Sequence, residues 1–221
     1  MSEAEIPHEQ DGGLPSGRPE HGPGGTEPPE HRVVPLFPLP DLILFPGQVQ
    51  PLMIFETRYR QMVRDLLDVN PELVLGTVLG EDKKRMAEVA PVQPVAGLGR
   101  IEQYRSLPDG RFVILVLGTR RVLVRPLEGD HLYPVCEIEP LPLEQEVIVD
   151  PIRRTRYEVR LRSALTDCWR EDSPPPEGVP LFQLADLLQM HMEMAPEQRY
   201  RIYATRPLEA RIESLLELAT R

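Results

Sequence analysis

Short apolar runs separated by turn residues fill the chain from Arg32 to about Leu143. The runs are rich in β-branched and aromatic residues, a composition typical of strands. They are Val33–Phe37, Val49–Phe55, Leu73–Leu79, Val95–Tyr104, Phe112–Gly118, Arg121–Pro126 and Tyr133–Glu139. Between Leu107 and Arg111 stands Pro-Asp-Gly, which predicts the tight turn of a hairpin.

A helical period interrupts the strands once and then replaces them. Tyr59, Met62, Val63, Leu66 and Leu67 recur at the spacing of one helix face. From Pro151 to Arg170 the pattern predicts a long arginine-rich helix that has Leu161, Leu165 and Trp169 on one side and ends before Ser173-Pro-Pro-Pro. Shorter helical segments are predicted at Leu181–Met192, at a turn opened by Pro196, and at Pro207–Ala219.

These patterns predict an α+β protein with three parts. Residues 1–31 are an acidic stretch rich in Pro and Gly with few large apolar residues, which predicts a disordered tail. Residues 32–145 form a β domain with one helix, and residues 146–221 form a helical domain. Trp169 is expected to lie between the long helix and its neighbours.

Composition restricts the classes of function. The formal net charge of −10 argues against a broad phosphate-binding surface, so nucleic acid is not the expected partner. No run is long and apolar enough for a membrane span, and the N-terminus lacks the pattern of a secretory signal, so we expect a cytoplasmic protein without membrane contact. Cys136 and Cys168 are too far apart in sequence for a disulfide framework or a paired zinc motif.

Motifs for catalysis, metals and cofactors are not recognised. The only lysines, Lys83 and Lys84, follow Asp82 without the glycine-rich lead of a phosphate-binding loop, and a charged surface loop is the favoured interpretation. His191-Met-Glu-Met-Ala lacks the second histidine of a zinc protease motif, and His131 and Cys136 have no third member of a catalytic group. We therefore expect no catalytic residue, no metal and no cofactor.

The helix at 151–170 carries a group of arginines that allows two interpretations. They are Arg153, Arg154, Arg156, Arg160 and Arg162. A solvated face that pairs with nearby acidic residues is favoured, and a site for an anionic partner is the alternative.

Three blocks of sequence resemble the N-terminal, substrate-binding domain of Lon-type proteases. The first runs from Val34 to Tyr59 and holds Pro35-Leu-Phe-Pro-Leu, Leu44-Phe-Pro-Gly and Pro51-Leu. The second runs from Gly97 to Arg121 and is similar to the family's central hairpin, with its Gly-x-x-Arg turn. The third, from Ala195 to Leu216, is similar to its closing helices. The blocks stand in the family's order and span nearly everything after residue 31.

The resemblance implies a PUA-like β-barrel followed by a C-terminal α-helical bundle. It also implies a role in binding unfolded or extended polypeptides, in protein quality control or as an adaptor, with a separate protease or chaperone as a further partner. Because nothing in this chain follows Arg221 that resembles an ATPase or protease domain, we expect a non-catalytic module. An RNA-binding or other PUA-like ligand-binding protein is the alternative, because the fold alone does not decide function.

Candidate residues fall into a binding set and a structural set. Methionine suits a surface with broad selectivity, and Met190 and Met194 share one face if their helix continues, although filling of the core is the favoured interpretation. Phe37, Leu42 and Met53 are the candidates on the β domain. Pro46 and Gly47 are expected to form a turn, with Phe45, Leu52, Ile54 and Phe55 in the core, while Arg58, Gly118 and Arg120 complete the structural motif. Both arginines are expected to brace loops by donating to carbonyls or carboxylates.

Overall fold

The computed structural model describes residues 16–17, 32–85, 91–141, 148–169 and 177–220. Apart from Ser16–Gly17, the predicted disordered tail lies outside these residues, and so does Ser173-Pro-Pro-Pro. Among the helices in the described ranges, none is both long and apolar enough to cross a membrane.

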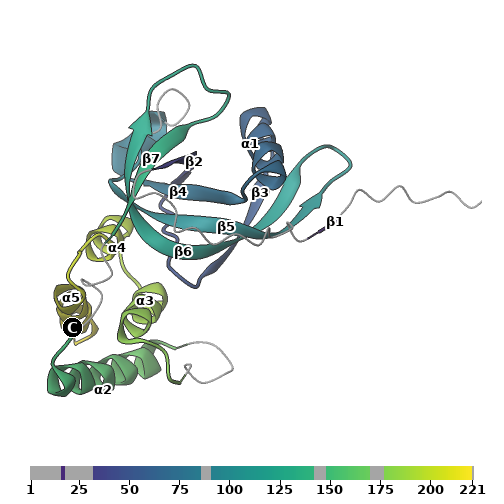
Figure 1. The fold of residues 1–221 in the computed structure, drawn as a ribbon. Coiled ribbons are helices and arrows are strands. Elements are labelled where there is room, and N and C mark those ends of the chain that lie inside the picture. Colours follow the sequence, from purple (N-terminus) through teal and green to yellow (C-terminus); the bar gives the residue numbers. More distant parts are fainter. Residues whose placement is uncertain (1–15, 18–31, 86–90, 142–147, 170–176, 221) are drawn as a thin grey trace, which may run out of the picture.

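The strands form one mixed sheet (Figure 1). Its strand pairings close a circuit, because β5 pairs with both β4 and β6. The order is β1-β5-β4-β2-β7-β6-β3, and β5 also pairs with β6. Among the described strand pairs, only β2 and β4 run parallel to each other. The strands are β1 (Ser16–Gly17), β2 (Arg32–Pro40), β3 (Val49–Ile54), β4 (Glu72–Val78), β5 (Val95–Ser106), β6 (Phe112–Leu127) and β7 (Val135–Pro140).

The expected break between Gly118 and Arg121 is absent, so the two strands predicted there are one strand, β6. Its first half pairs with β3 and its second half with β7, while β5 follows it along both halves. The register against β5 shifts between Leu98/Arg120 and Gly99/Gly118, which leaves Thr119 as an extra residue. A β-bulge therefore replaces the predicted gap, because one inserted residue bends a strand without ending it.

Helix α1 (Thr57–Asp68) covers the inner face of the sheet (Figure 1). Its buried residues are Tyr59, Met62, Val63 and Leu66, members of the predicted apolar stripe. They pack in one cluster with residues from β4, β5 and β6, including Leu73, Ile101 and Ile114. The helical period in this part of the sequence thus predicted the element and its buried side correctly.

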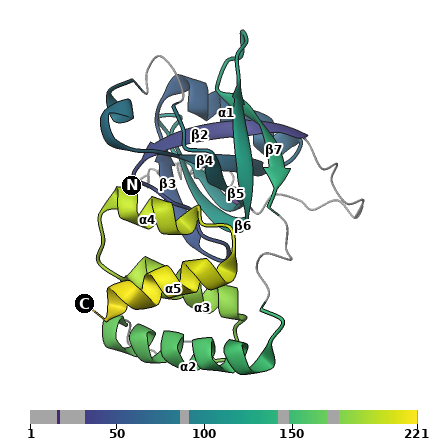
Figure 2. The same cartoon turned by 90° about the vertical axis from the view of Figure 1, so that its left-hand side faces the viewer.

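Four further helices stack below the strands (Figure 2). They are α2 (Pro151–Cys168), α3 (Leu181–His191), α4 (Pro196–Tyr203) and α5 (Leu208–Ala219). Asp150 caps α2, because its side chain accepts hydrogen bonds from the backbone of Ile152 at 2.9 Å and of Arg153 at 3.2 Å. Leu161 and Leu165 are buried as predicted, and Trp169 is half-buried with its ring 4.3 Å from that of His191.

Helix α4 joins these helices to the sheet through three polar contacts. The Tyr200 hydroxyl accepts a hydrogen bond from the backbone N–H of Val95 at 2.9 Å, and the Tyr203 hydroxyl donates to the carbonyl of Leu44 at 3.1 Å. Arg121 donates from Nη1 to the carbonyl of Tyr203 at 2.9 Å. All three contacts are buried, and Phe45 and Val95 pack beside the two tyrosine rings. The helices are therefore fixed to the strands by directional bonds as well as apolar packing.

The turn at Pro46-Gly47 has the predicted geometry. Gly47 adopts a φ of +83°, in the left-handed region where a side chain is strained. Its N–H donates to the carbonyl of Gly118 at 2.8 Å, and the N–H of Gly118 donates to Gln48 at 2.8 Å. A Cβ on Gly118 would lie 2.1 Å from the carbonyl oxygen of Phe45. Gly118 is therefore required by the close approach of two backbones.

Candidate functional site

Three paired strand segments form a ribbon whose two faces differ in exposure. The ribbon consists of β3, residues 112–118 of β6 and residues 100–106 of β5, and we call it the platform. Residues paired across an antiparallel sheet share a face, so the register assigns side chains to faces. One row contains Met53, Val113 and Arg105, and the neighbouring row on the same face contains Pro51, Leu115 and Gln103.

The inner face of the platform is buried under α1. Ile54, Phe112, Ile114, Val116 and Ile101 alternate with the outer rows and are at most 6% exposed. The ring of Phe112 also lies 5.7 Å from the guanidinium of Arg64, on the exposed side of α1. This face therefore belongs to the core and offers nothing to a partner.

The outer face carries apolar side chains that remain accessible. Val49 and Met53 are each 53% exposed, and Phe55, directly after β3, is 66% exposed. Val113, Leu115 and Leu117 lie on the same face of β6 and are half-buried. Isolated exposed apolar residues are common, but a contiguous group on one sheet face is typical of an interaction surface.

Charged residues border the platform at the tip of the β5–β6 hairpin. Arg111 donates from Nη1 to the Met53 sulfur at 3.5 Å and pairs through Nε with Asp109 at 2.7 Å. The backbone hydrogen bond from Arg111 holds the pKa of Asp109 below its ordinary value, and the Arg111 side chain acts in the same direction. The tip thus places a fixed positive group beside an exposed apolar one.

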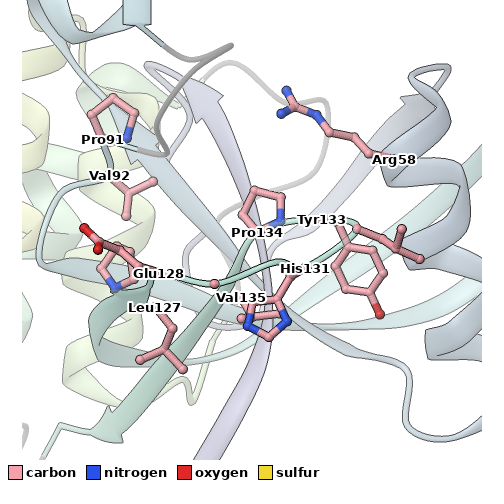
Figure 3. Close-up of a pocket in the computed structure, with 12 residues that line it drawn as sticks. Arg58, Pro91, Val92, Leu127, Glu128, His131, Tyr133, Pro134 and Val135 are labelled. Atoms are coloured by element: carbon pink, nitrogen blue, oxygen red, sulfur yellow. The ribbon is translucent and has the colours of Figure 1, made fainter.

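A groove lies on a separate part of the sheet, between the β6–β7 hairpin, the segment at Pro91-Val92 and the start of α1 (Figure 3). Its volume is about 630 Å³, and we call it the hairpin groove. Its lining is mainly apolar, with Arg58, Glu128, His131 and Tyr133 as its charged or titratable members. Leu132, also in the lining, is 75% exposed. Such a groove accommodates a few side chains of an extended ligand.

Two polar residues of the hairpin groove, Tyr133 and Arg58, have structural partners outside it. Tyr133 donates from its hydroxyl to Asp65 at 3.0 Å, and burial together with this bond raises the pKa of Tyr133. Arg58 pairs with Glu56 at 3.1 Å and lies 4.6 Å from the ring centre of Tyr59. Arg58 therefore pairs with a carboxylate, as expected. The partner is close in sequence, so the contact braces the first turn of α1 and does not join distant loops.

The predicted binding residues of the β domain are separated by burial. Phe37 is only 8% exposed, with its ring 4.4 Å from that of Tyr59, so it is a core residue and its assignment to a binding surface was wrong. The reason is that Phe37 packs in the cluster that α1 covers, beside Tyr59 and Met62. Leu42 is half-buried against the same cluster. Only Met53 lies on the accessible face of the platform.

Met190 and Met194 pack against two different clusters. Met190 lies beside Tyr200 and Tyr203, where α4 meets the sheet, and Met194 packs against the core of the helices. Helix α3 ends at His191, so the shared helix face on which their pairing depended does not extend to Met194. Both are half-buried, which agrees with filling of the core.

The bracing role expected of Arg120 belongs to its neighbour. Arg120 is exposed, whereas Arg121 is 6% exposed and donates to Tyr203. Along β6 adjacent residues point to opposite faces, so a shift of one residue exchanges a solvent position for a buried one. The Gly-x-x-Arg spacing counted from Gly118 already indicates Arg121.

Residues considered for catalysis lie apart. His131 is exposed in a loop, and Cys136 is buried in β7, where burial raises its pKa to about 12. Lys83 pairs with Asp41 at 2.6 Å and Lys84 with Glu81, both at the surface. In the described part of the chain no three metal-ligating side chains of His, Cys, Asp or Glu come together.

The arginines of α2 are partly paired with acidic neighbours. Arg153 binds Glu209 at 3.1 Å and Arg162 binds Glu158 at 3.1 Å. Arg154, Arg156 and Arg160 are exposed. This arrangement is that of a solvated helix face.

Sequence reasoning missed most of the platform. Val49, Val113, Leu115 and Leu117 were assigned to strands but not to a surface, and Phe55 was wrongly assigned to the core. The available signal is that both alternating sets of β6, Phe112-Ile114-Val116 and Val113-Leu115-Leu117, are apolar. A strand apolar on both faces needs two covers, and α1 supplies only one.

A mixed sheet with one covering helix, followed by stacked helices, is the fold of a known class of binding domain. The family model described as the ATP-dependent protease La (LON) substrate-binding domain matches residues 33–221, and the chain belongs to this family. Two solved structures have the same fold. The Lon N-terminal domain protein from Xanthomonas campestris has a TM-score of 0.60 at 24% identity and covers 84% of this chain and 98% of its own. The N-terminal domain of the Mycobacterium avium complex Lon protease has a TM-score of 0.62 at 16% identity, covering 86% and 98%.

Two relatives named as Lon proteases match over only part of their own length. Lon protease 2 of Desulfotalea psychrophila is 25% identical over 202 residues, which are 86% of this chain and 25% of that protein. The Lon protease of Anaeromyxobacter dehalogenans is 25% identical over 203 residues, 86% and 23% respectively. The chain thus spans about a quarter of the length of these relatives.

Proposed function

We propose that the chain is a non-catalytic module that binds unfolded or extended polypeptide on the outer face of the platform. The observation that carries the proposal is the accessible apolar group of Val49, Met53 and Phe55 on a ribbon whose other face is buried. Unfolded chains expose apolar side chains and unpaired backbone, and an apolar sheet face beside strand edges satisfies both. Membership of the Lon substrate-binding family supports this class of ligand.

Several finer assignments belong to the same proposal. The sheet is proposed to be a PUA-like β-barrel, which the closed circuit of strand pairs supports. The proposed domains are residues 32–145 and 146–221. The module acts in the cytoplasm, in protein quality control or as an adaptor, and delivers bound polypeptide to a separate protease or chaperone. The hairpin groove is a secondary contact for the same ligand, since its lining is mainly apolar.

The test is a titration of fluorescently labelled casein, an unfolded polypeptide, followed by anisotropy. We expect a micromolar or weaker Kd, because a shallow surface must also order a flexible ligand. The variant Met53→Ser/Phe55→Ser should weaken binding roughly tenfold. We expect the two exposed apolar contacts together to contribute about 1.4 kcal/mol to the binding free energy, which corresponds to tenfold in Kd. A matched control, Val69→Ser/Val149→Ser, removes two apolar residues that are 88% and 90% exposed elsewhere, and should bind as the parent does.

Equal affinity of the parent and the platform variant for casein would mean that the binding site lies elsewhere.

A parallel titration with labelled single-stranded RNA at low and moderate salt distinguishes polypeptide binding from the alternative, RNA binding. Phosphate contacts would make RNA affinity fall steeply with salt, whereas apolar and backbone contacts depend on it little. Tight, salt-sensitive RNA binding without casein binding would contradict the proposal.

A further inference from the structure

The part of the β5 edge that β4 does not pair with is occupied by a short extended segment from the N-terminal region. Ser16–Gly17 forms β1 and pairs antiparallel with β5, with Ser16 opposite Arg105 and Gly17 opposite Tyr104 (Figure 1). On this side of β5 the neighbouring strand β4 is paired only as far as Arg100. Within the described residues, β1 is thus the strand that occupies the edge between Glu102 and Ser106.

This edge belongs to the platform. Tyr104 and Arg105 pair with Ile114 and Val113 of β6 on their other side. Tyr104 packs against the buried cluster beneath, and Arg105 is exposed on the outer face. An unpaired strand edge presents backbone N–H and C=O groups that accept any extended chain, whatever its side chains. A polypeptide added here would place alternate side chains on the platform's outer face.

The sequence around β1 limits how strongly it holds the edge. Pro15 and Pro19 flank the paired residues, and proline has no backbone N–H to donate to a ladder. A strand of two residues also makes few hydrogen bonds, each of modest net strength in water. The segment is therefore suited to occupy the edge reversibly.

We propose that residues 102–106 of β5 are a docking edge for an extended polypeptide strand, and that the chain's own Ser16–Gly17 segment competes for it. The proposal rests on the proposed polypeptide-binding function and adds the mode of binding and its restraint. While the segment is paired, the edge is closed to other chains. When it separates, an incoming polypeptide takes over the same backbone partners. The apparent Kd then equals the Kd of the open edge divided by the fraction of molecules in which the edge is open.

The test uses the full chain with two substitutions in the segment itself. The variant Ser16→Pro/Gly17→Pro removes both N–H donors of β1 without changing the platform. We expect it to bind labelled casein roughly threefold to tenfold more tightly than the parent, as for an edge left open in about a tenth to a third of molecules. The control Gly24→Pro/Gly25→Pro makes the same chemical change away from the pairing and should leave the Kd unchanged.

Hydrogen exchange measured without casein provides an independent readout. Amides of residues 102–106 should exchange faster in Ser16→Pro/Gly17→Pro than in the parent or the control. Unchanged exchange would overturn the pairing. Faster exchange with an unchanged casein Kd would overturn the competition while leaving the proposed function in place. If neither parent nor variants bind casein, the proposed function itself fails, and the docking edge fails with it.

Discussion

At the scale of single residues, side chains of the same type differ widely in burial and in their partners. Arg120 and Arg121 are adjacent, but only Arg121 is buried and donates to Tyr203. Phe37 and Phe55 are both strand phenylalanines in the sequence, yet they are 8% and 66% exposed. Gly47 was predictable, since a Pro-Gly turn favours a positive φ. The need for Gly118 arises from the carbonyl of Phe45, which is distant in sequence, and so required the structure.

The two cysteines should differ in reactivity for the same reason. Cys136 is fully buried, and burial raises its pKa to about 12, whereas Cys168 is half-buried at the end of α2. In the Cys168→Ala variant at pH 8, the folded protein should react with Ellman's reagent far more slowly than the denatured chain, because the thiolate is the nucleophile.

The raised pKa of Cys136 also makes the free energy of unfolding depend on pH. A thiol whose folded pKa is raised keeps its proton where the unfolded thiol loses it. Its stabilising contribution is therefore present below about pH 9 and is lost as the pH rises toward about 12. Rapid modification of native Cys168→Ala at pH 8 would show that Cys136 is accessible.

At the scale of elements, periodicity predicted most helices and strands. It did not predict which face of a strand is packed against a helix. The stripe from Tyr59 to Leu66 correctly gave α1 and its buried side, because both follow from local spacing. The apolar pattern of 112–118 gave a strand without indicating which face α1 would cover. The continuity of β6 was also missed, because its change of partner from β3 to β7 depends on residues distant in sequence.

The attachment of α4 to the sheet leads to a stability prediction. Tyr200→Phe removes the hydroxyl that accepts the buried N–H of Val95, and should lower the free energy of unfolding by about 1–3 kcal/mol. Chemical denaturation measures the change. Tyr104→Phe is the matched control, because in the described ranges its hydroxyl makes no hydrogen bond and the residue is only half-buried. An equal loss in both variants would mean that the Val95 contact contributes nothing specific.

At the scale of the whole molecule, the helices and the platform differ in how their apolar residues are packed. The helices pack their half-buried methionines against apolar clusters and are fixed to the strands through α4. The strands carry an accessible apolar face and an edge that takes an extended segment. Resemblance to a known family predicted this class of protein. It did not predict the surface, because the accessible face depends on which side of the ribbon α1 covers.

Hydrogen exchange of the full chain, measured with and without saturating casein, shows whether polypeptide binds on the platform. A bound extended chain should slow exchange in β3 and in residues 102–106 of β5. Among the described strands, β3 pairs with β6 alone, and the outer edge of residues 102–106 pairs with β1 alone. Exchange in α2 and α5 should not change. Protection confined to α2–α5, with exchange in β3 and β5 unchanged at saturation, would show that polypeptide does not bind on the platform.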